Sequence, residues 1–314
     1  MSRRCYICYK NTNYQSHYHP LCLELLYHSK QAPSISFTIE DIESLATQFI
    51  KQKMGIPGVQ KKLSLSLDEN NHGSKRLTIV GYLGGEYILK PPTPNYPYMP
   101  EIEDLTMHLA SIAGITVALH GLIPMQNGEL AYITKRFDRI NQRKIAAEDL
   151  CQLSGKLTEN KYKGSSEAAS KIIAQYSSIP GEEVLKFFEL LLFCFLVGNS
   201  DMHLKNFSLI TEDPSRITLS PVYDLLSTKL LISEKDDPEE LALNLNGKKS
   251  NLDTKDFLNF GKSLGIHEKV VNYTIERMKF FLSEWHVKIK ESFISEDLKD
   301  KYQELIERRI KKLT

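Results

Sequence analysis

Two polar residues that could support phosphoryl transfer lie five positions apart in the middle of the chain. Asp201 and Asn206 belong to the stretch Gly198-Asn-Ser-Asp-Met-His-Leu-Lys-Asn-Phe-Ser208, and Asp224 ends the later stretch Pro221-Val-Tyr-Asp224. The D-x-x-x-x-N spacing is that of a kinase catalytic loop, in which the aspartate orients a hydroxyl while the asparagine and a second aspartate hold Mg²⁺. The pair alone is a weak signal, because a chain of this length contains roughly one by chance. Its interpretation depends on the segments around it.

A glycine-bearing loop offers candidates for binding phosphate. Gly55-Ile-Pro-Gly58-Val-Gln-Lys-Lys62 leads into residues 63–67, whose alternating leucine and serine predict a β-strand with one buried face. Backbone N–H groups in such a loop can approach a phosphate closely. This assigns to a nucleotide site the loop residues Gly58, Val59, Gln60 and Lys61. The ordinary interpretation of two glycines three apart is a plain turn.

Lys90 is the expected cation for the α- and β-phosphates. It ends Glu86-Tyr-Ile-Leu-Lys90, which we expect to pair with residues 77–82 in a hairpin around Gly84-Gly85. A lysine at the end of an inner strand is where a kinase holds this charge. Glu103, in the next predicted helix, could pair with Lys90, but its place in an acidic first turn favours the interpretation that it only complements the helix dipole.

The order of predicted elements indicates an α+β fold with two lobes. Strands dominate up to residues 130–137, and helices dominate after the polar stretch Asn141-Gln-Arg-Lys144. Lys135 and Phe137 lie at this crossover, where an adenine would meet backbone groups and Phe137 could stack on it. We expect three parts: a short Cys/His module over residues 1–35, a small, mostly β N-lobe over 36–140 and a larger helical C-lobe over 141–314.

Helical periodicity predicts the elements of the larger lobe. Residues 182–197 are strongly apolar and predict a central buried helix. Trp285, the only tryptophan, is expected in the core, and the charged residues 234–240 are expected to be mobile. Further helical patterns cover residues 39–51, 101–113, 253–264, 268–292 and 295–312.

Three cysteines and a histidine near the N-terminus have zinc-ligand spacing. Cys5-x-x-Cys8 is followed by His19-x-x-Cys22, and each pair can form a tight knuckle that presents two ligands to a tetrahedral ion. His17 is an alternative fourth ligand. The competing interpretation is a set of reduced, half-buried cysteines beside a histidine.

Composition excludes several classes of protein. Lys and Arg number 40 against 39 Asp and Glu, so no overall positive charge points to nucleic acid. The N-terminal residues lack the apolar core of a secretory signal, and the longest apolar run, residues 190–197, is too short to span a bilayer. Five cysteines, an odd number, do not suggest a disulfide framework. We therefore expect a cytoplasmic protein.

Taken together, these landmarks resemble the HipA family of bacterial toxin serine/threonine kinases over roughly residues 54–310. The resemblance implies a two-lobed protein-kinase-like fold that uses ATP and Mg²⁺. The segments resemble, in order, the family's G-x-Q-x-K loop, ATP-lysine strand, hinge, E-D-x-C-Q segment, catalytic loop and P-x-Y-D: Gly58-Val-Gln-Lys-Lys-Leu-Ser-Leu, Tyr87-Ile-Leu-Lys90, Arg136-Phe-Asp-Arg139, Glu148-Asp-Leu-Cys-Gln152, the stretch from Gly198 to Ser208 and Pro221-Val-Tyr-Asp224.

The sequence departs from the family's pattern in two places. The 53 residues before the matching region leave little room for the N-terminal subdomain of longer members, as in the HipT type, whose missing subdomain is a separate protein, HipS, encoded beside the antitoxin HipB. Family members also autophosphorylate a serine in the glycine loop, where this sequence has Gly55-Ile-Pro57 and no hydroxyl. The resemblance therefore implies HipS-like and HipB-like partners, with DNA bound only indirectly through the antitoxin.

The resemblance also implies a role for each site residue. Asp201 would orient a substrate hydroxyl or accept its proton, Asn206 and Asp224 would hold Mg²⁺, and Lys90 would bind the phosphates under the glycine loop. Lys205 would add positive charge near the transferred group, and His203 would brace the catalytic loop. Because the family's substrates are aminoacyl-tRNA synthetases, the implied outcome is stalled translation by the toxin of a type II toxin–antitoxin system.

Two other functions remain open from sequence. A small-molecule kinase of the antibiotic- or sugar-phosphorylating type shares the Asp/Asn/Asp logic, although the H-x-K-N and E-D-x-C-Q segments argue against it. A non-catalytic binding module would use the Cys/His knuckle and a degenerate kinase body. The two are separated from a protein kinase by where phosphate is transferred and by whether Mg-ATP stabilises the fold.

Overall fold

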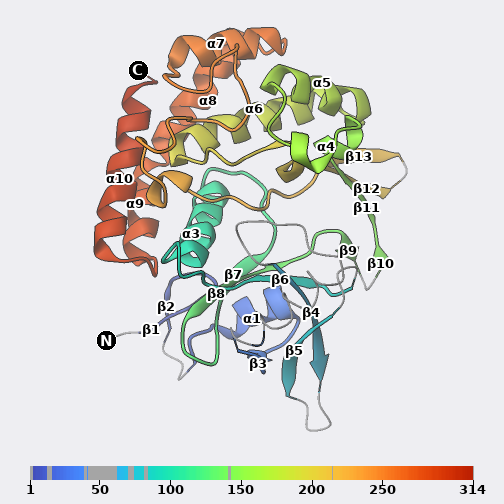
Figure 1. Ribbon diagram of the computed structural model, residues 1–314, viewed down its shortest axis with the longest axis vertical. Coiled ribbons are helices and arrows are strands. Elements are labelled where there is room, and N and C mark those ends of the chain that lie inside the picture. Colours follow the sequence, from blue (N-terminus) through green and yellow to red (C-terminus); the bar gives the residue numbers. More distant parts are fainter. Residues whose placement is uncertain are drawn as a thin grey trace. The chain divides into compact units, whose positions relative to one another are not determined.

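The computed structural model describes residues 3–12, 16–38, 41, 62–69, 74–80, 84–140, 143–213 and 215–313 (Figure 1). The chain divides into two compact units, and the division falls within helix α3 (Met99–Ile112). Unit 1 comprises Met1–Asp104 and Ala118–Arg136, and unit 2 comprises Leu105–Val117 and Phe137–Thr314. The predicted three-part division stays a prediction.

Unit 1 is built on a six-stranded sheet with the order β3-β5-β4-β6-β8-β7. All neighbours are antiparallel except β3 and β5. The alternating leucines of β4 bury Leu65, as the sequence pattern predicts. The strands are β3 (Ser34–Ile35), β4 (Leu63–Glu69), β5 (Lys75–Ile79), β6 (Tyr87–Lys90), β7 (His120–Pro124) and β8 (Leu130–Lys135).

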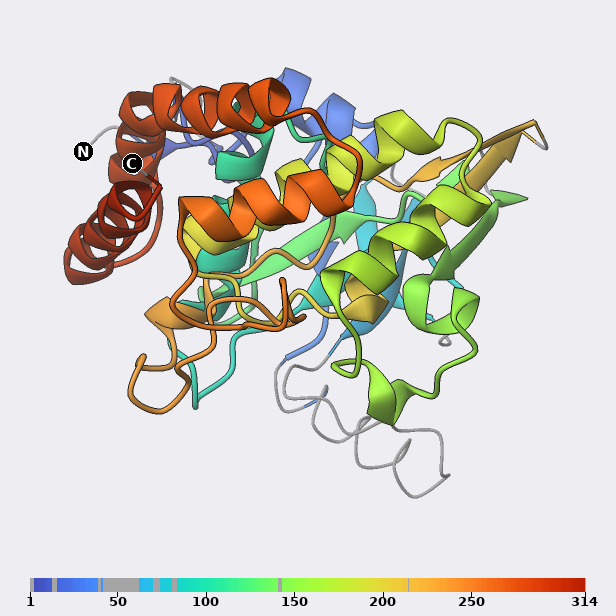
Figure 2. The same cartoon turned by 90° about the horizontal axis from the view of Figure 1, so that it is seen from above.

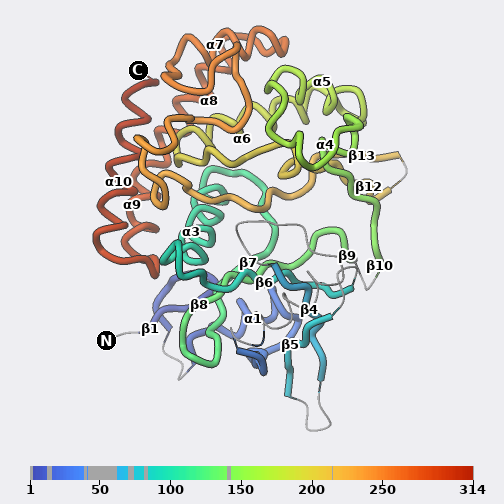
Figure 3. Tube along the Cα trace, viewed as in Figure 1, coloured from blue at the N-terminus to red at the C-terminus, as the bar shows by residue number. Residues whose placement is uncertain are grey.

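The predicted hairpin around Gly84-Gly85 is wrong. β5 pairs with β4, beside which it runs in Figure 3, and β6 pairs with the opposite edge of β4. Gly85 instead provides a close approach to β4: its φ is +79°, and the next amide, from Glu86, donates to the Leu65 carbonyl at 2.9 Å. Periodicity identifies the strands but not the edge of β4 that each one joins.

The N-terminal segment shares a hydrophobic core with this sheet. It contains β1 (Arg3–Arg4), β2 (Asn11–Thr12) and helix α1 (Pro20–Tyr27). Leu23, Leu26 and Tyr27 of α1 pack in one cluster with side chains of β4, β5 and β6. The Tyr87 hydroxyl of β6 also donates to the Leu26 carbonyl at 3.0 Å. Unit 1 therefore includes the Cys/His segment as part of its packing.

Unit 2 is mainly helical and is organised around α6 (Pro180–Val197), drawn in yellow in Figure 2. This helix buries twelve of its side chains and packs against α5, α8 and α10, as expected of a central helix. A small sheet of β11, β12 and β13 and the pair β9–β10 complete the unit. Its elements are β9 (Arg139–Ile140), β10 (Arg143–Lys144), β11 (Ala146–Asp149), α4 (Leu150–Leu153), η1 (Thr158–Asn160), α5 (Ser166–Tyr176), α6, η2 (Leu204–Asn206), β12 (Ser208–Asp213), β13 (Arg216–Leu219), η3 (Thr228–Leu230), α7 (Thr254–Ser263), α8 (Glu268–Phe280), α9 (Leu282–Glu291) and α10 (Glu296–Lys311).

Two further expectations for unit 2 are wrong. The single helix predicted over 268–292 is broken at Phe281, where ψ is −4° and the backbone closes a tighter turn onto Met278. The charged stretch 234–240 is held by ion pairs, since Asp237 accepts from Lys229 at 2.6 Å and buried Glu240 accepts from Lys312 at 2.7 Å. Sequence shows the charges but not their distant partners.

Of the remaining expectations, one is confirmed and one concerns residues that the structure does not describe. Trp285 is fully buried, and its indole N–H donates to the Leu109 carbonyl at 3.0 Å. The helix predicted over 39–51 lies almost entirely outside the described residues. Among the described helices, none combines the length and the apolar character needed to cross a lipid bilayer.

We expect Gly85→Ala to destabilise the protein far more than Gly128→Ala. Both glycines have positive φ, +79° and +86°, so an alanine at either position costs about 1 kcal/mol. A Cβ on Gly85 would also lie 2.5 Å from the Leu65 carbonyl oxygen, whereas a Cβ on Gly128 would meet nothing within 4 Å. The clash should add about 1 to 3 kcal/mol. Urea unfolding of both variants measures the difference, and equal losses would contradict the close approach of this turn to β4.

Candidate active site

The candidate catalytic loop begins where α6 ends. Gly198 has φ +70° and caps α6, donating its amide to carbonyls of the last turn. A Cβ there would lie 2.8 Å from the Leu305 side chain of α10, so the position needs glycine for both space and conformation. The chain then passes through η2 into β12, which pairs with β11 and β13.

Asp201 and Asn206 are joined across the loop. The Asn206 side-chain amide donates to the Asp201 carbonyl at 3.2 Å, and the Asp201 amide donates to the Asn199 side chain at 3.0 Å. Asn206 is buried, at 6% exposed, while Asp201 is exposed. Because the amide nitrogen of Asn206 is used within the loop, its amide oxygen is the atom suited to hold a cation.

Asp224 is placed by the tyrosine that precedes it. The half-buried Tyr223 hydroxyl donates to the Lys205 carbonyl at 2.9 Å and lies 2.7 Å from the Ser208 hydroxyl, which ties this segment to the catalytic loop. Asp224 itself has φ +60°, a conformation that non-glycine residues rarely adopt. Such strain persists only where surrounding contacts impose it, and it is found at functional sites.

Tyr162 is a site residue that sequence reasoning missed. Its hydroxyl donates to Asp201 Oδ1, and its ring packs edge-on against His203 with centroids 5.0 Å apart. Burial, and then the hydrogen bond to Asp201, raise the pKa of Tyr162 well above its usual value. In sequence it is one tyrosine in a polar loop, 39 positions before Asp201, and no local pattern connects the two residues.

The side chains of His203 and Lys205 contact residues outside the catalytic loop. Burial lowers the pKa of His203, although the charge of Asp201 opposes this shift, so the ring is neutral at pH 7. The Lys205 ammonium pairs with Asp149 at 2.7 Å. Asp149 also accepts the Gln152 amide in a capping box that starts α4. The Glu148-Asp-Leu-Cys-Gln152 segment therefore anchors the catalytic loop through Lys205.

In unit 1, Lys90 and Glu103 form a buried ion pair. The Lys90 ammonium lies 2.5 Å from Glu103 Oε1, and the two residues are 3% and 0% exposed. Lys90 also lies 5.4 Å from the ring centroid of Tyr132, its cross-strand neighbour on β8. The geometry is that of the predicted Lys–Glu pair, and Glu103 does more than complement the dipole of α3.

The other residues predicted to bind nucleotide lie in different parts of the chain. Phe137 packs against Tyr223 with ring centroids 5.3 Å apart, within unit 2. In unit 1, the Lys135 ammonium lies 2.5 Å from His28 Nε2, and burial lowers the pKa of Lys135. The glycine loop, with Gly58, Val59, Gln60 and Lys61, lies outside the described residues.

The predicted zinc ligands converge. One ligand atom from each of Cys5, Cys8, His19 and Cys22 lies within 4.8 Å of all the others. The alternative ligand, His17, is outside this group and stacks on Tyr6, with centroids 4.5 Å apart. None of the five cysteines, all of which lie within the described residues, forms a disulfide.

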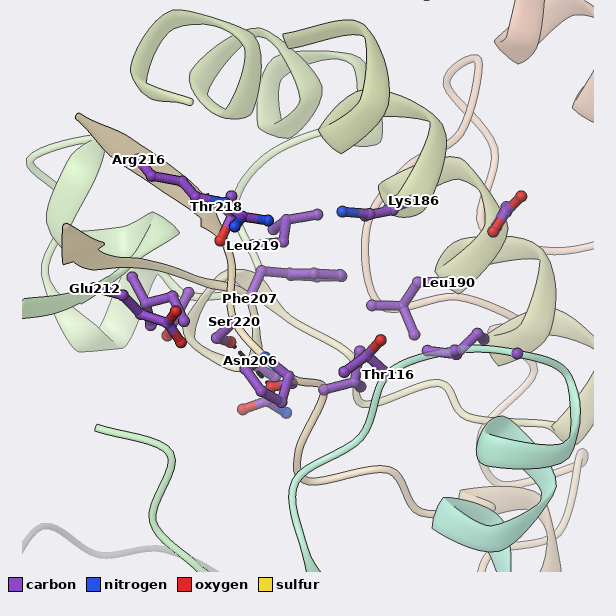
Figure 4. Close-up of a pocket in the computed structure, with 17 residues that line it drawn as sticks. Thr116, Lys186, Leu190, Asn206, Phe207, Glu212, Arg216, Thr218, Leu219 and Ser220 are labelled. Carbon is purple, nitrogen blue, oxygen red and sulfur yellow. Dashed lines mark hydrogen bonds between the residues drawn. The ribbon is translucent and has the colours of Figure 1, made fainter. Parts of the chain in front are cut away.

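A cavity of about 350 Å³ lies beside the catalytic loop in unit 2 (Figure 4). Asn206 and Ser220 line one part of it, and Lys186 and Arg216 line another. Lys186 is already paired with Glu182 and Glu183. Neither Asp201 nor Asp224, the two predicted catalytic carboxylates, lines the cavity.

Comparison with known proteins identifies the fold and the family. A solved structure of the HipA, HipB and operator DNA complex of Shewanella oneidensis MR-1 superposes with a TM-score of 0.70 at 23% identity, covering 87% of this chain and 70% of that one. This likeness confirms the α+β, kinase-like fold. The family model described as HipA-like C-terminal domain matches residues 54–285. The chain belongs to this family.

Relatives of this chain carry kinase names. A Haemophilus influenzae protein named "Putative kinase" is 27% identical over 266 residues, covering 76% of this chain and 75% of the relative. The serine/threonine-protein kinase toxin HipA of Shewanella oneidensis is 28% identical over 213 residues, covering 62% of this chain. The chain spans only 47% of that toxin's length. The family resemblance inferred from sequence is therefore confirmed. The names of these relatives support a kinase.

We expect Tyr223→Phe to weaken both the fold and Mg²⁺-dependent nucleotide binding. The variant keeps the ring but removes the hydroxyl that ties Tyr223 to Lys205 and Ser208. Losing this partly buried bond should lower the free energy of unfolding by about 1 to 2 kcal/mol. Tyr176→Phe, at an exposed ring, is the control. Thermal unfolding with and without Mg-ATP measures both effects, and a Tyr223→Phe variant indistinguishable from the control would contradict this role.

Proposed function

We propose that this chain is an ATP- and Mg²⁺-dependent serine/threonine protein kinase. The observation that carries the proposal is the arrangement of the catalytic loop. The Asn206 side-chain amide donates a hydrogen bond to the Asp201 carbonyl, and the Asp201 carboxylate accepts a hydrogen bond from the Tyr162 hydroxyl. A carboxylate that accepts a hydroxyl's proton and an asparagine oxygen held five residues away are the two parts that such a loop must supply.

In this proposal, Lys90 and the polar residues of the catalytic loop and of the Asp224 segment have the following roles. Asp201 orients the acceptor hydroxyl and receives its proton, and Lys90 binds the phosphates of ATP beneath the 55–61 loop. Asn206 and Asp224 would hold Mg²⁺, which when bound neutralises charge on the phosphates. His203, whose ring packs edge-on against Tyr162, would brace the loop. Lys205 adds positive charge near the transferred group while its pairing with Asp149 fixes the loop.

The proposed biological role is that of a toxin in a type II toxin–antitoxin system. Membership of the HipA-like family supports a protein substrate of the aminoacyl-tRNA synthetase class, whose phosphorylation would arrest translation in the cytoplasm. The Shewanella HipA was solved with HipB and operator DNA, which supports a HipB-like antitoxin for this chain. The proposal also takes the chain to be of the HipT type with a HipS-like partner, and DNA to be bound only through the antitoxin.

Labelled ATP and a panel of aminoacyl-tRNA synthetases, with and without the neighbouring antitoxin proteins, test the proposal. We expect the parent to label one synthetase, and Asp201→Asn to reduce this labelling by about 10³-fold, because the general base is lost. Glu276→Gln, which changes an exposed carboxylate on α8, should behave as the parent. Label that enters metabolites of a lysate and no protein would overturn the proposal in favour of a small-molecule kinase.

Tyr162→Phe should raise kcat/KM for the protein substrate about fivefold, because a substrate hydroxyl must displace the Tyr162 hydroxyl from Asp201. Tyr273→Phe, at an exposed ring of α8, is the control. Steady-state kinetics with the identified substrate measure the change. A fall in kcat/KM would show instead that Tyr162 holds Asp201 in its working orientation.

A further inference from the structure

The Cys/His group of unit 1 has the geometry of a zinc site before any ion is added. Around tetrahedral Zn²⁺, with bonds of about 2.3 Å to sulfur and 2.0 Å to nitrogen, sulfur and nitrogen ligands lie roughly 3.5 Å apart. His19 Nδ1 lies 3.3 Å from Cys8 Sγ and 4.0 Å from Cys22 Sγ. Cys5 completes the group and is fully buried. The two distances from His19 lie on either side of the value expected around the ion, and the four ligand atoms are grouped closely enough to share it.

The surroundings prepare these atoms for a metal. His19 Nε2 lies 3.1 Å from the Asn11 carbonyl, so this nitrogen carries the proton and donates it, which leaves Nδ1 as the ligand atom that faces the thiols. A histidine that donates its second N–H to a carbonyl is the usual outer-shell arrangement of a metal ligand. The His19 backbone amide also donates to Cys5 Sγ at 3.4 Å. These contacts are independent of the ligand spacing in sequence.

The tight turn of residues 5–10, which carries Cys5 and Cys8 and is called the knuckle here, fixes the position of Tyr9. The Tyr9 amide donates to the Cys5 carbonyl at 2.9 Å, and the Cys5 amide donates to the Lys10 carbonyl at 3.0 Å. Tyr9 has φ +67°, so its backbone is held in a conformation that tyrosine rarely adopts. The side chain is fully buried. Anything that holds Cys5 and Cys8 together therefore also sets where the Tyr9 ring points.

Tyr9 connects the knuckle to α3. Its hydroxyl donates to Asp104 Oδ2 at 2.6 Å, while Asp104 Oδ1 lies 2.6 Å from His120 Nδ1 on β7. Asp104 is fully buried, and it directly follows Glu103, the partner of Lys90. Because consecutive residues of a helix move together, anchoring Asp104 also fixes the position of Glu103.

We propose that Cys5, Cys8, His19 and Cys22 bind one Zn²⁺, and that this site, acting through Tyr9 and Asp104, positions the Lys90–Glu103 pair for nucleotide. The ligands and Tyr9 lie outside residues 54–285, the region that the family model matches. Tyr9 is a positioning residue, since it touches Asp104 and not the nucleotide. The nucleotide part of this inference depends on the proposed kinase function, but the metal site does not.

The metal site is tested by metal analysis of the full chain. We expect the purified parent and Cys151→Ser to contain one zinc per chain, because Cys151 is a buried cysteine of unit 2 outside the site. Cys22→Ser should lose the zinc. A parent without zinc, or a Cys22→Ser variant that retains it in full, would overturn the site.

Tyr9→Phe tests the coupling against Tyr18→Phe, a matched change beside the same knuckle. Tyr18 is also buried, but its hydroxyl donates to the Leu122 carbonyl of β7 and not to Asp104. We expect both variants to keep their zinc. Only Tyr9→Phe should weaken direct binding of Mg-ATP, by about tenfold, and raise KM for ATP with a smaller change in kcat.

The two possible failures are distinguishable. A parent that contains zinc but does not bind Mg-ATP contradicts the proposed kinase function and leaves the metal site standing. A parent that binds both, with Tyr9→Phe equal to Tyr18→Phe in nucleotide affinity, contradicts the coupling alone. Removal of zinc from the parent by a chelator provides a further check, because it should lower Mg-ATP affinity at least as much as Tyr9→Phe does.

Discussion

The buried ion pair between Lys90 and Glu103 is the constraint on which the sheet unit depends. Two charges removed from water are stable only when each holds the other in good geometry, and a buried charge left alone costs about 3 to 5 kcal/mol. Both ends are therefore fixed: β6 lies between β4 and β8, so Lys90 leaves an inner strand, and Glu103 lies on α3 beside the anchored Asp104. The strand order and the helix position together place the two groups 2.5 Å apart.

The helical unit also has to hold charged side chains in fixed positions, and it does so mainly with hydrogen bonds. Its catalytic loop contains little regular structure, so the positions of Asp201 and Asp224 depend on individual side chains of other segments. Tyr223 ties the segment before Asp224 to the loop, and Asp149 holds Lys205 while it also caps α4. The positive φ of Asp224 costs about 1 to 3 kcal/mol, which these contacts must offset. A loop held in this way can present carboxylates without burying them.

Sequence predicted the parts of the structure that depend on near neighbours. Alternation identified β4, helical periodicity identified α6, and short-range spacing brought the Cys/His group together. It failed where the outcome depends on distant partners. No local pattern shows that β5 and β6 join opposite edges of β4, or that residues 234–240 are fixed by ion pairs to distant segments. The same limit explains why Glu103 could be named from sequence as a possible partner of Lys90 while dipole compensation was the favoured interpretation.

Tyrosine hydroxyl groups form several of the contacts that hold the candidate site residues in position and that the sequence motifs do not specify. Tyr162, Tyr223 and Tyr9 each donate one hydrogen bond that fixes the setting of an acidic residue, and the bond to Asp104 spans 95 positions in sequence. A rigid ring with two torsion angles positions a hydroxyl at low entropic cost, which suits it to hold a carboxylate or the loop beside it. Tyr9 lies outside the matched family region, whereas Tyr162 and Tyr223 lie inside it. Chains that share the Asp, Asn and Lys motifs can therefore differ in the side chains that hold these motifs in position, and Tyr9 is where this chain draws its support from its own N-terminal segment.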